Sequence, residues 1–188
     1  WNTFIPPIQH PITEQYLVCL FNAEDWYLLP ADAEQVRLNE VKSMPKVDEE
    51  TGDWMRPDVF SADGSQVVGT VFGARNTTSE PPTPIGLGIF TFETSEYQMH
   101  LLTYPENYWN TPATLTPNGS HAIIGDRTQI RAVNLETGKV IPILKFQTIS
   151  GQCCTVTTDG YLYYIATRDE RNIWLSEIDD VPMQTTDN

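Results

Sequence analysis

Acidic side chains are the residues of this sequence with the clearest capacity for chemistry. They number 25 against 11 lysines and arginines, which gives a formal net charge of −14. The densest group is Asp48-Glu49-Glu50-Thr51-Gly52-Asp53, whose carboxylate and carbonyl oxygens are ligands that calcium prefers. This group lacks the alternating acidic positions that hold calcium ligands on one side of a loop. A solvated acidic loop is therefore the favoured interpretation.

The sequence lacks the common motifs of hydrolases, zinc sites and phosphate-binding loops. It has no Gly-x-Ser-x-Gly nucleophile elbow, and its three histidines, His10, His100 and His121, lack the spacing of a zinc site. Gly86-Leu87-Gly88 lacks the third glycine of a phosphate-binding loop. We expect no catalytic residue, cofactor or metal site. A hydrolase that uses two carboxylates in a pocket stays an alternative, because their separation depends on the fold.

The composition and net charge of the chain limit the classes of partner that it can bind. The 188 residues are 40% hydrophobic and include 5 Trp, 8 Tyr and 7 Phe, which is enough apolar area for a globular chain. The negative charge repels phosphate backbones and anionic headgroups, so nucleic acid and membrane surfaces are poor partners. No apolar run reaches the roughly 18 residues of a membrane span. A protein partner or a small ligand is expected.

Alternation with a period of two dominates the chain. Residues 66–72, 88–92, 97–102 and 161–165 are short, β-branched and aromatic, which is typical of strands. No stretch of ten residues shows the apolar stripe of a surface helix, and residues 31–41 come nearest. The sequence predicts an all-β fold with little or no helix.

A turn motif recurs three times along the chain. Residues 61–69, 116–124 and 157–165 each read as a strand end, an Asp-Gly or Asn-Gly turn and a buried strand. Such pairs suit primed hairpin turns, which need positive φ at their central residues. A third strand, a second turn and a fourth strand follow, most clearly in residues 129–143. A glycine-poor copy can be aligned over residues 14–38.

The copies define four repeats spaced about 50, 55 and 41 residues, as measured between Glu14, Gly64, Gly119 and Gly160, which compares with the roughly 40 to 50 residues of a propeller blade. We place them in a single propeller-like domain, residues 1–188, at 4–41, 56–104, 112–146 and 149–180. Residues 42–58 are an acidic connector and residues 74–86 a Pro-rich insertion, and both are expected at the surface. Loops on a rigid scaffold commonly carry binding functions.

These repeats resemble the WD40-like repeats of the TolB family and the YVTN-type propeller blades. The resemblance rests on the three turn motifs, on residues 132–140 and on residues 172–178, and it covers 56–180 well and 1–41 poorly. It implies a β-propeller-like array of about four antiparallel four-stranded blades, either a closed four-bladed ring or a partial propeller. Propellers of this type serve as scaffolds, sensors and enzyme gates, so the resemblance indicates a fold rather than an activity.

The last repeat stops after its third strand, because residues 179–188 show no apolar alternation. Phe4–Ile8 is a proline-containing candidate for the missing strand. Without it, Ile173–Ile178 is an open edge that can accept a partner's strand. If the ring closes, the first and last repeats are neighbours, and a disulfide between Cys19 and Cys153, or Cys154, becomes feasible.

The leading hypothesis is a non-catalytic propeller-type module for binding, sensing or scaffolding. Since the sequence starts at Trp1, we expect a processed product or an excised part of a larger protein, with a periplasmic or extracellular location favoured. A structural subunit docking through its open edge, in a homo-oligomer or a larger assembly, is a further alternative. The residues expected at a partner-binding loop or edge are Asp48, Glu49, Glu50, Asp53, Trp54, Glu80, Trp109, Ile173 and Trp174.

Overall fold

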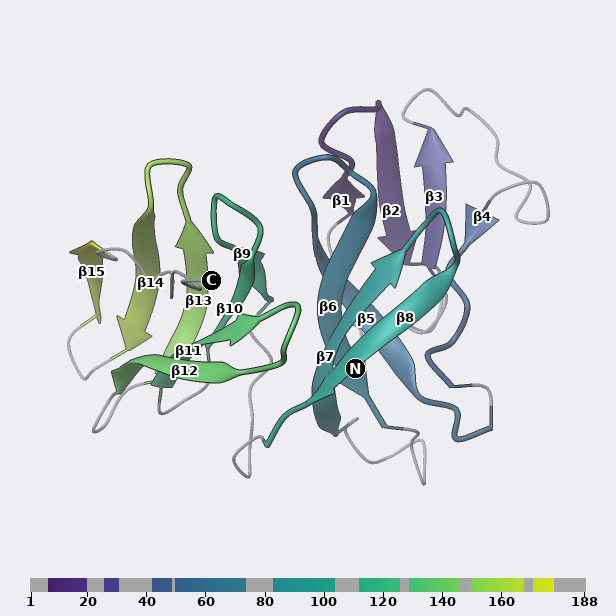
Figure 1. Cartoon of the computed structure of the whole chain (residues 1–188). Helices are drawn as coiled ribbons and strands as arrows, with labels where there is room; N and C mark the ends of the chain where they lie inside the picture. The colour runs from purple at the N-terminus through teal and green to yellow at the C-terminus, as the bar shows by residue number, and fades with distance from the viewer. Residues whose placement is uncertain are drawn as a thin grey trace, which may run out of the picture. The chain divides into compact units, whose positions relative to one another are not determined.

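A computed structural model describes the backbone of most of the chain. The described residues are 7–19, 26–30, 42–48, 50–73, 83–103, 112–125, 129–145, 150–167 and 171–177, and for 42–43, 150–154, 165–167 and 171–177 only the backbone is described. Within these ranges the structure has fifteen strands and no helix (Figure 1). The prediction of an all-β fold is confirmed.

The first sheet is an antiparallel meander of four strands in sequence order. Its two middle strands, β2 (Gln15–Cys19) and β3 (Trp26–Pro30), pair along their full length. The flanking strands are only two residues long, β1 (Ile8–Gln9) and β4 (Lys42–Ser43). The sequence suggested that the amino-terminal segment could complete the last sheet. Strand β1 instead pairs with β2, so this part of the segment belongs to the first sheet.

The second sheet holds the longest strands of the first half. It follows the order β5 (Trp54–Phe60), β6 (Gln66–Phe72), β7 (Pro84–Thr91) and β8 (Glu96–Leu101), all antiparallel. Every residue of β6 after Gln66 is buried, on both faces of the strand. Strand β6 is therefore covered on both sides, as the middle strand of a stacked sheet would be.

The third and fourth sheets repeat this pattern. The third runs β9 (Thr114–Leu115), β10 (His121–Gly125), β11 (Gln129–Asn134) and β12 (Val140–Lys145). The fourth has three strands, β13 (Ser150–Val156), β14 (Tyr161–Thr167) and β15 (Arg171–Glu177). Four successive meander sheets confirm the predicted array of about four blades.

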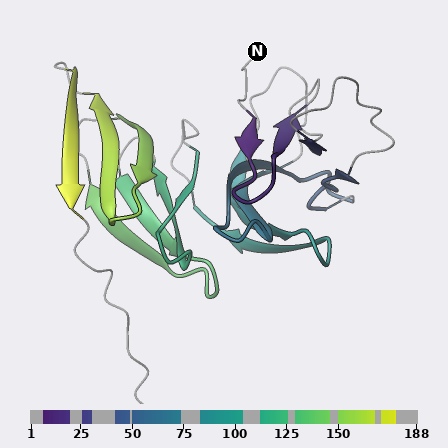
Figure 2. The same ribbon diagram turned by 90° about the horizontal axis from the view of Figure 1, so that it is seen from above.

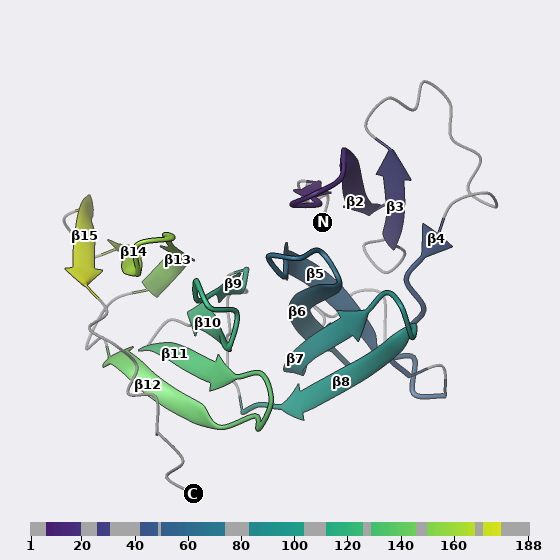
Figure 3. The same ribbon diagram turned by 45° about the horizontal axis from the view of Figure 1, so that its top comes forward.

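The chain divides into two compact units, residues 1–108 and 109–188, and each unit has two sheets around its own core. In the first unit, apolar residues of both sheets form one cluster, and β1 lies beside β5 (Figure 3). This cluster consists of Leu17, Trp26, Met44, Met55, Phe60, Val67, Val71 and Phe90.

In the second unit, β13 packs beside β9 and β10. Leu162 of the fourth sheet joins Ile123, Ile130 and Ala132 of the third in a buried cluster. The sequence period of two produces this packing, because alternate residues of each strand reach the same face. The single domain expected for residues 1–188 stays a prediction.

Two boundaries differ from those expected. Strand β5 begins at Trp54, inside the range assigned to the acidic connector, and Trp54, Met55 and Pro57 are buried. Strand β7 begins at Pro84, inside the range assigned to the Pro-rich insertion, and residues 74–82 lie outside the described residues. Both strands start earlier because their apolar residues face the core. None of the described segments is a helix able to span a bilayer.

Candidate functional site

The three recurrent turn motifs form one structural device. In the β5–β6 turn, Ser61 Oγ donates to Asp63 Oδ1 at 2.7 Å, and the N–H and Oγ of Ser65 donate to the same oxygen at 3.0 and 2.8 Å. These hydrogen bonds hold the pKa of Asp63 down at about 2, with the Ser61 hydroxyl as the largest cause. The Asp63 carboxylate therefore stabilises its own turn.

The β9–β10 turn repeats these contacts with an amide in place of the carboxylate. Thr116 Oγ1 and Ser120 Oγ donate to Asn118 Oδ1, each at 2.8 Å, and the N–H of Ser120 donates at 3.1 Å. In the β13–β14 turn, Thr157 Oγ1 donates to Asp159 Oδ1. A hydroxyl two residues before Asp or Asn thus closes all three turns.

The turn type differs from the primed type expected. Gly64, Gly119 and Gly160 have φ of +70°, +69° and +90°, whereas Asp63 and Asn118 before them do not have positive φ. The glycine N–H donates to the carbonyl three residues earlier, for example to Ser61 O at 2.9 Å. These are type I turns followed by a left-handed glycine, because the side-chain hydrogen bonds favour that geometry over a primed turn.

The acidic segment 48–53 is a turn of a second recurrent kind. Asp48 Oδ1 accepts the N–H of Glu50 at 2.8 Å and of Thr51 at 3.2 Å, while Gly52 N–H donates to Asp48 O at 2.9 Å. The backbone hydrogen bonds, that of Thr51 first, hold the pKa of Asp48 below its usual value. The Asp48 side chain therefore stabilises its own turn.

The β11–β12 turn has the same construction. Asn134 Oδ1 accepts the N–H of Glu136 at 3.1 Å and of Thr137 at 2.8 Å, and Gly138 N–H donates to Asn134 O at 2.9 Å. In the β7–β8 turn, Ser95 N–H donates to Thr91 O at 2.9 Å. Ser95 has φ of +58°, in the place that Gly138 holds with φ of +72°.

Only some of the predicted partner-binding residues lie among the described residues. Asp48 and Glu50 are exposed in their turn, and Asp53 is half-buried at its end. Ile173 and Trp174 lie on β15, where only the backbone is described. Glu49, Glu80 and Trp109 lie outside the described residues, so a partner site at all these positions stays a proposal.

Trp54 does not belong to the exposed loop in which the sequence placed it. Its side chain is 3% exposed, and its ring stacks on Phe72 of β6 with the ring centroids 4.7 Å apart. The register explains this burial, because Trp54 pairs directly with Phe72. Trp54 is a packing residue of the second sheet.

Cys19, one half of the expected disulfide, lies half-buried on β2. The Cys153 and Cys154 side chains on β13 lie outside the described residues. The bridge between the first and last repeats therefore stays a prediction.

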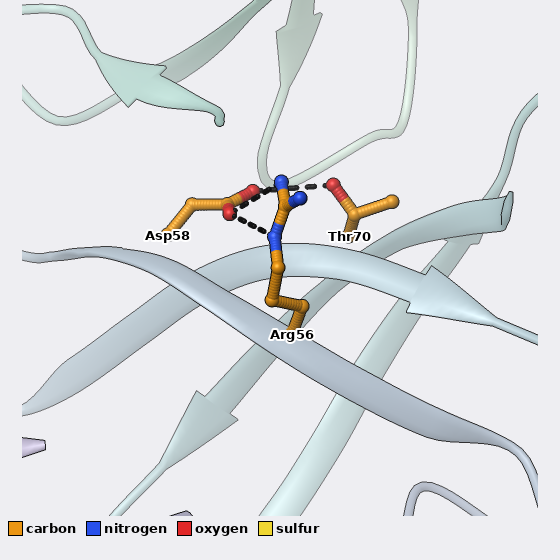
Figure 4. A network of polar contacts seen from close by, with 3 residues as sticks. All are labelled: Arg56, Asp58 and Thr70. Carbon is orange, nitrogen blue, oxygen red and sulfur yellow. Dashed lines mark hydrogen bonds and ion pairs between the residues drawn. The ribbon is translucent and has the colours of Figure 1, made fainter. Parts of the chain in front are cut away.

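A buried ion pair in the second sheet was missed by the sequence reasoning. Nε and Nη2 of Arg56 both lie 2.7 Å from Oδ1 of Asp58, and Thr70 Oγ1 donates to Oδ2 at 3.1 Å (Figure 4). The Arg56 and Asp58 side chains are 12% and 1% exposed. Two charges within an apolar strand were the available signal. Asp58 lies at a β-bulge of the strand, and the Arg56 guanidinium compensates its buried charge within the sheet.

A histidine joins the two turns at one end of the third sheet. His121 Nδ1 lies 2.7 Å from Ser120 Oγ, and its Nε2 lies 3.4 Å from Asn134 Nδ2. Since Asn134 Oδ1 already accepts three donors, the amide donates to Nε2, and Nδ1 carries the imidazole proton. Partial burial lowers the pKa of His121. The ring thus connects the two turns through its two nitrogens.

Known metal and titratable-site arrangements are not evident in the described parts of the chain. Within those parts, no three His, Cys, Asp or Glu side chains lie close enough together to hold a metal ion. Burial raises the pKa of Tyr97, whose hydroxyl donates to Pro45 O at 2.8 Å. The polar side chains described above share one role, which is to stabilise turns and strand edges.

Comparison with known proteins identifies the fold. No protein-family model and no curated protein matches the sequence. Among solved structures, TolB from Acinetobacter baumannii matches with a TM-score of 0.59 and 14% identity, over 91% of this chain and 39% of its own. The Cps50 (Swd1) β-propeller domain of Myceliophteria thermophila matches with a TM-score of 0.58 and 15% identity, over 90% of this chain and 58% of its own.

A chain of the mitotic checkpoint complex also matches, with a TM-score of 0.54 and 14% identity, over 90% of this chain and 46% of its own. This chain thus spans less than two thirds of each of these three proteins. Identities this low show the fold alone. Together with four meander sheets in succession, they show that the chain has the fold of β-propeller blades, similar to those of TolB and of the Cps50 (Swd1) propeller domain.

Proposed function

We propose that this chain is a non-catalytic binding or scaffolding module of the β-propeller type, and the extracytoplasmic part of a larger or processed protein. The observation that supports this most is the internal use of its recurrent polar residues. The side-chain oxygens of Asp48, Asp63, Asn118, Asn134 and Asp159 all accept hydrogen bonds from their own turns. The motifs that look chemical in the sequence build the scaffold.

Acidic side chains recur at one exposed position of the turns. The second recurrent turn presents an exposed glutamate each time, as Glu50, Glu93 and Glu136, in a chain of net charge −14. Such a field attracts cationic partners and speeds their association. The likeness to a chain of the mitotic checkpoint complex supports a protein as the partner. We therefore favour a basic protein segment.

Binding to a lysine-rich peptide tests the partner class. We expect affinity that falls as salt rises, because exposed charges are screened. Glu50→Gln, Glu93→Gln and Glu136→Gln each remove one negative charge and should weaken binding, whereas the control Glu14→Gln removes the same charge from the exposed β1–β2 turn. An equal effect of all four variants contradicts the assignment to these turns.

Turnover assays test the absence of catalysis. A panel of glycosidase, esterase, peptidase and phosphatase substrates, with and without divalent metals, should show no turnover by the purified chain. Turnover that a single carboxylate substitution abolishes would contradict the proposal and support the alternative of a carboxylate-based hydrolase. Fractionation of the producing cells tests the location, and recovery with cytosolic markers would contradict an extracytoplasmic role.

A further inference from the structure

The fourth sheet ends in a long strand edge. Strand β15 pairs with β14 along its whole length, from Arg171 opposite Thr167 to Glu177 opposite Tyr161. The three other sheets each continue to a fourth strand, whereas no described residue pairs with the outer edge of β15 (Figure 2). Residues 178–183, Ile-Asp-Asp-Val-Pro-Met, also lack the Glu-Thr-Gly or Glu-Thr-Ser turn that follows β7 and β11. The backbone donors and acceptors of this edge can accept another strand.

The last strands of the other three sheets are less able to pair with a further strand. Strand β4 has two residues, β8 has six, and β12 has six with Pro142, which lacks a backbone donor. Strand β15 has seven residues and no proline. Among the strands that come last in the four sheets, it is the longest.

The sequence of β15 is complementary to itself. It reads Arg-Asn-Ile-Trp-Leu-Ser-Glu, with its two charges of opposite sign at the ends. An antiparallel copy centred on Trp174 places Arg171 opposite Glu177 of the partner subunit. The same register sets polar opposite polar and apolar opposite apolar between the ends. Strand β8 lacks this symmetry, because its Glu96 would face a leucine.

We propose that β15 pairs antiparallel with β15 of a second copy of this chain, so that each copy supplies the fourth strand of the other's sheet. The two-fold axis passes at Trp174, and six strands form one continuous sheet. A two-fold interface of this kind uses the same residues twice, so both charge pairs form together. A slip by one residue loses these pairs and reverses the faces, which fixes the register. The inference does not depend on the cationic partner proposed above.

Charge exchange at the strand ends tests the register. In light scattering and sedimentation across a concentration series, the native chain should show twice the monomer mass. Arg171→Glu alone and Glu177→Arg alone each set like charges opposite one another at two positions, so the dimer dissociation constant should rise about tenfold. The double variant Arg171→Glu/Glu177→Arg restores opposite charges and should recover the native constant within about threefold. The control Glu96→Arg makes the same charge change as Glu177→Arg at the edge of β8 and should leave the dimer intact.

Disulfide trapping provides a second readout. The register sets position 172 opposite position 176, with the Cα separation of a directly opposed pair, which a disulfide can span. A mixture of Asn172→Cys and Ser176→Cys chains should therefore form a covalent dimer in excess of either variant alone. A native chain that stays monomeric throughout the series, a dimer insensitive to the charge exchange, or equal trapping by single variants and mixture would each overturn the proposal.

Discussion

The turn glycine between β5 and β6 is constrained by its backbone and by a neighbour from the first sheet. Gly64 has φ of +70°, and a Cβ built there would lie 2.1 Å from Cε1 of His10. Gly119 has φ of +69° in the corresponding turn, and a Cβ there would meet nothing within 4 Å. Alanine at either position strains the backbone, but only Gly64→Ala must also displace an imidazole.

The structure sets the size of the difference. An alanine in the left-handed region costs about 1–2 kcal/mol at either turn. Displacing His10 also loses the hydrogen bond to Gly64 O at 3.2 Å, worth about 0.5–1.5 kcal/mol, and the contact with Phe60, worth a similar amount. Gly64→Ala should therefore lower the free energy of unfolding by about 2–5 kcal/mol, against about 1–2 kcal/mol for Gly119→Ala.

Urea unfolding followed by tryptophan fluorescence measures these losses. Because the two turns belong to different units, the sharper comparison places Gly64→Ala in the native chain and in a His10→Ala chain. Without the imidazole, the loss caused by Gly64→Ala should fall to the backbone cost alone, and the difference is the coupling energy. The same loss in both backgrounds would refute the argument that His10 links the two sheets.

Three further predictions follow from the turns. Ser95→Gly should raise the free energy of unfolding by about 1 kcal/mol, because Ser95 holds a left-handed position that Gly138 fills in the related turn, and Ser95→Ala, which keeps the strain, should bring no gain in urea unfolding. Because the folded state lowers the pKa of His121, stability should fall as pH falls below about 6.5, and thermal unfolding should show a smaller fall for His121→Gln; equal falls would contradict this. In an NMR titration Asp63 should stay ionised down to about pH 2, and Ser61→Ala should raise its pKa.

The turns could be read from the sequence because their chemistry is local. The hydrogen bonds that define the motif at Ser61, Thr116 and Thr157 join residues at most five positions apart. A repeated short motif therefore predicts a repeated turn and, by its spacing, a repeated sheet. The turn type was wrong, because Asn118 keeps negative φ while its side chain accepts three hydrogen bonds.

The charge of the acidic segment predicts a solvated loop. The spacing of its residues indicates a specific turn. Asp48-x-Glu-Thr-Gly and Asn134-x-Glu-Thr-Gly share one pattern, in which the first side chain accepts backbone N–H groups of the turn. This shared pattern predicts the same turn at both places. The carboxylate of Glu50 is then an exposed group that the turn presents, and no hydrogen bond of the turn described above uses it.

Contacts between distant residues could not be read in this way. Asp58, at the bulge of β5, accepts a hydrogen bond from Thr70 of the next strand, and His10 reaches a turn 54 residues away. Trp54 is buried because its strand pairs with β6, although its neighbours in sequence are acidic. Each depends on the register and packing of sheets, which short motifs do not specify.

Cross-strand NMR contacts test most directly whether the chain consists of four separate meander sheets. The account predicts backbone contacts between Val68 and Ile89, between Ile123 and Ala132, and between Tyr164 and Trp174. These pairs lie within the second, third and fourth sheets, respectively. Backbone pairing of strands from different repeats in one continuous sheet of a single chain would contradict it.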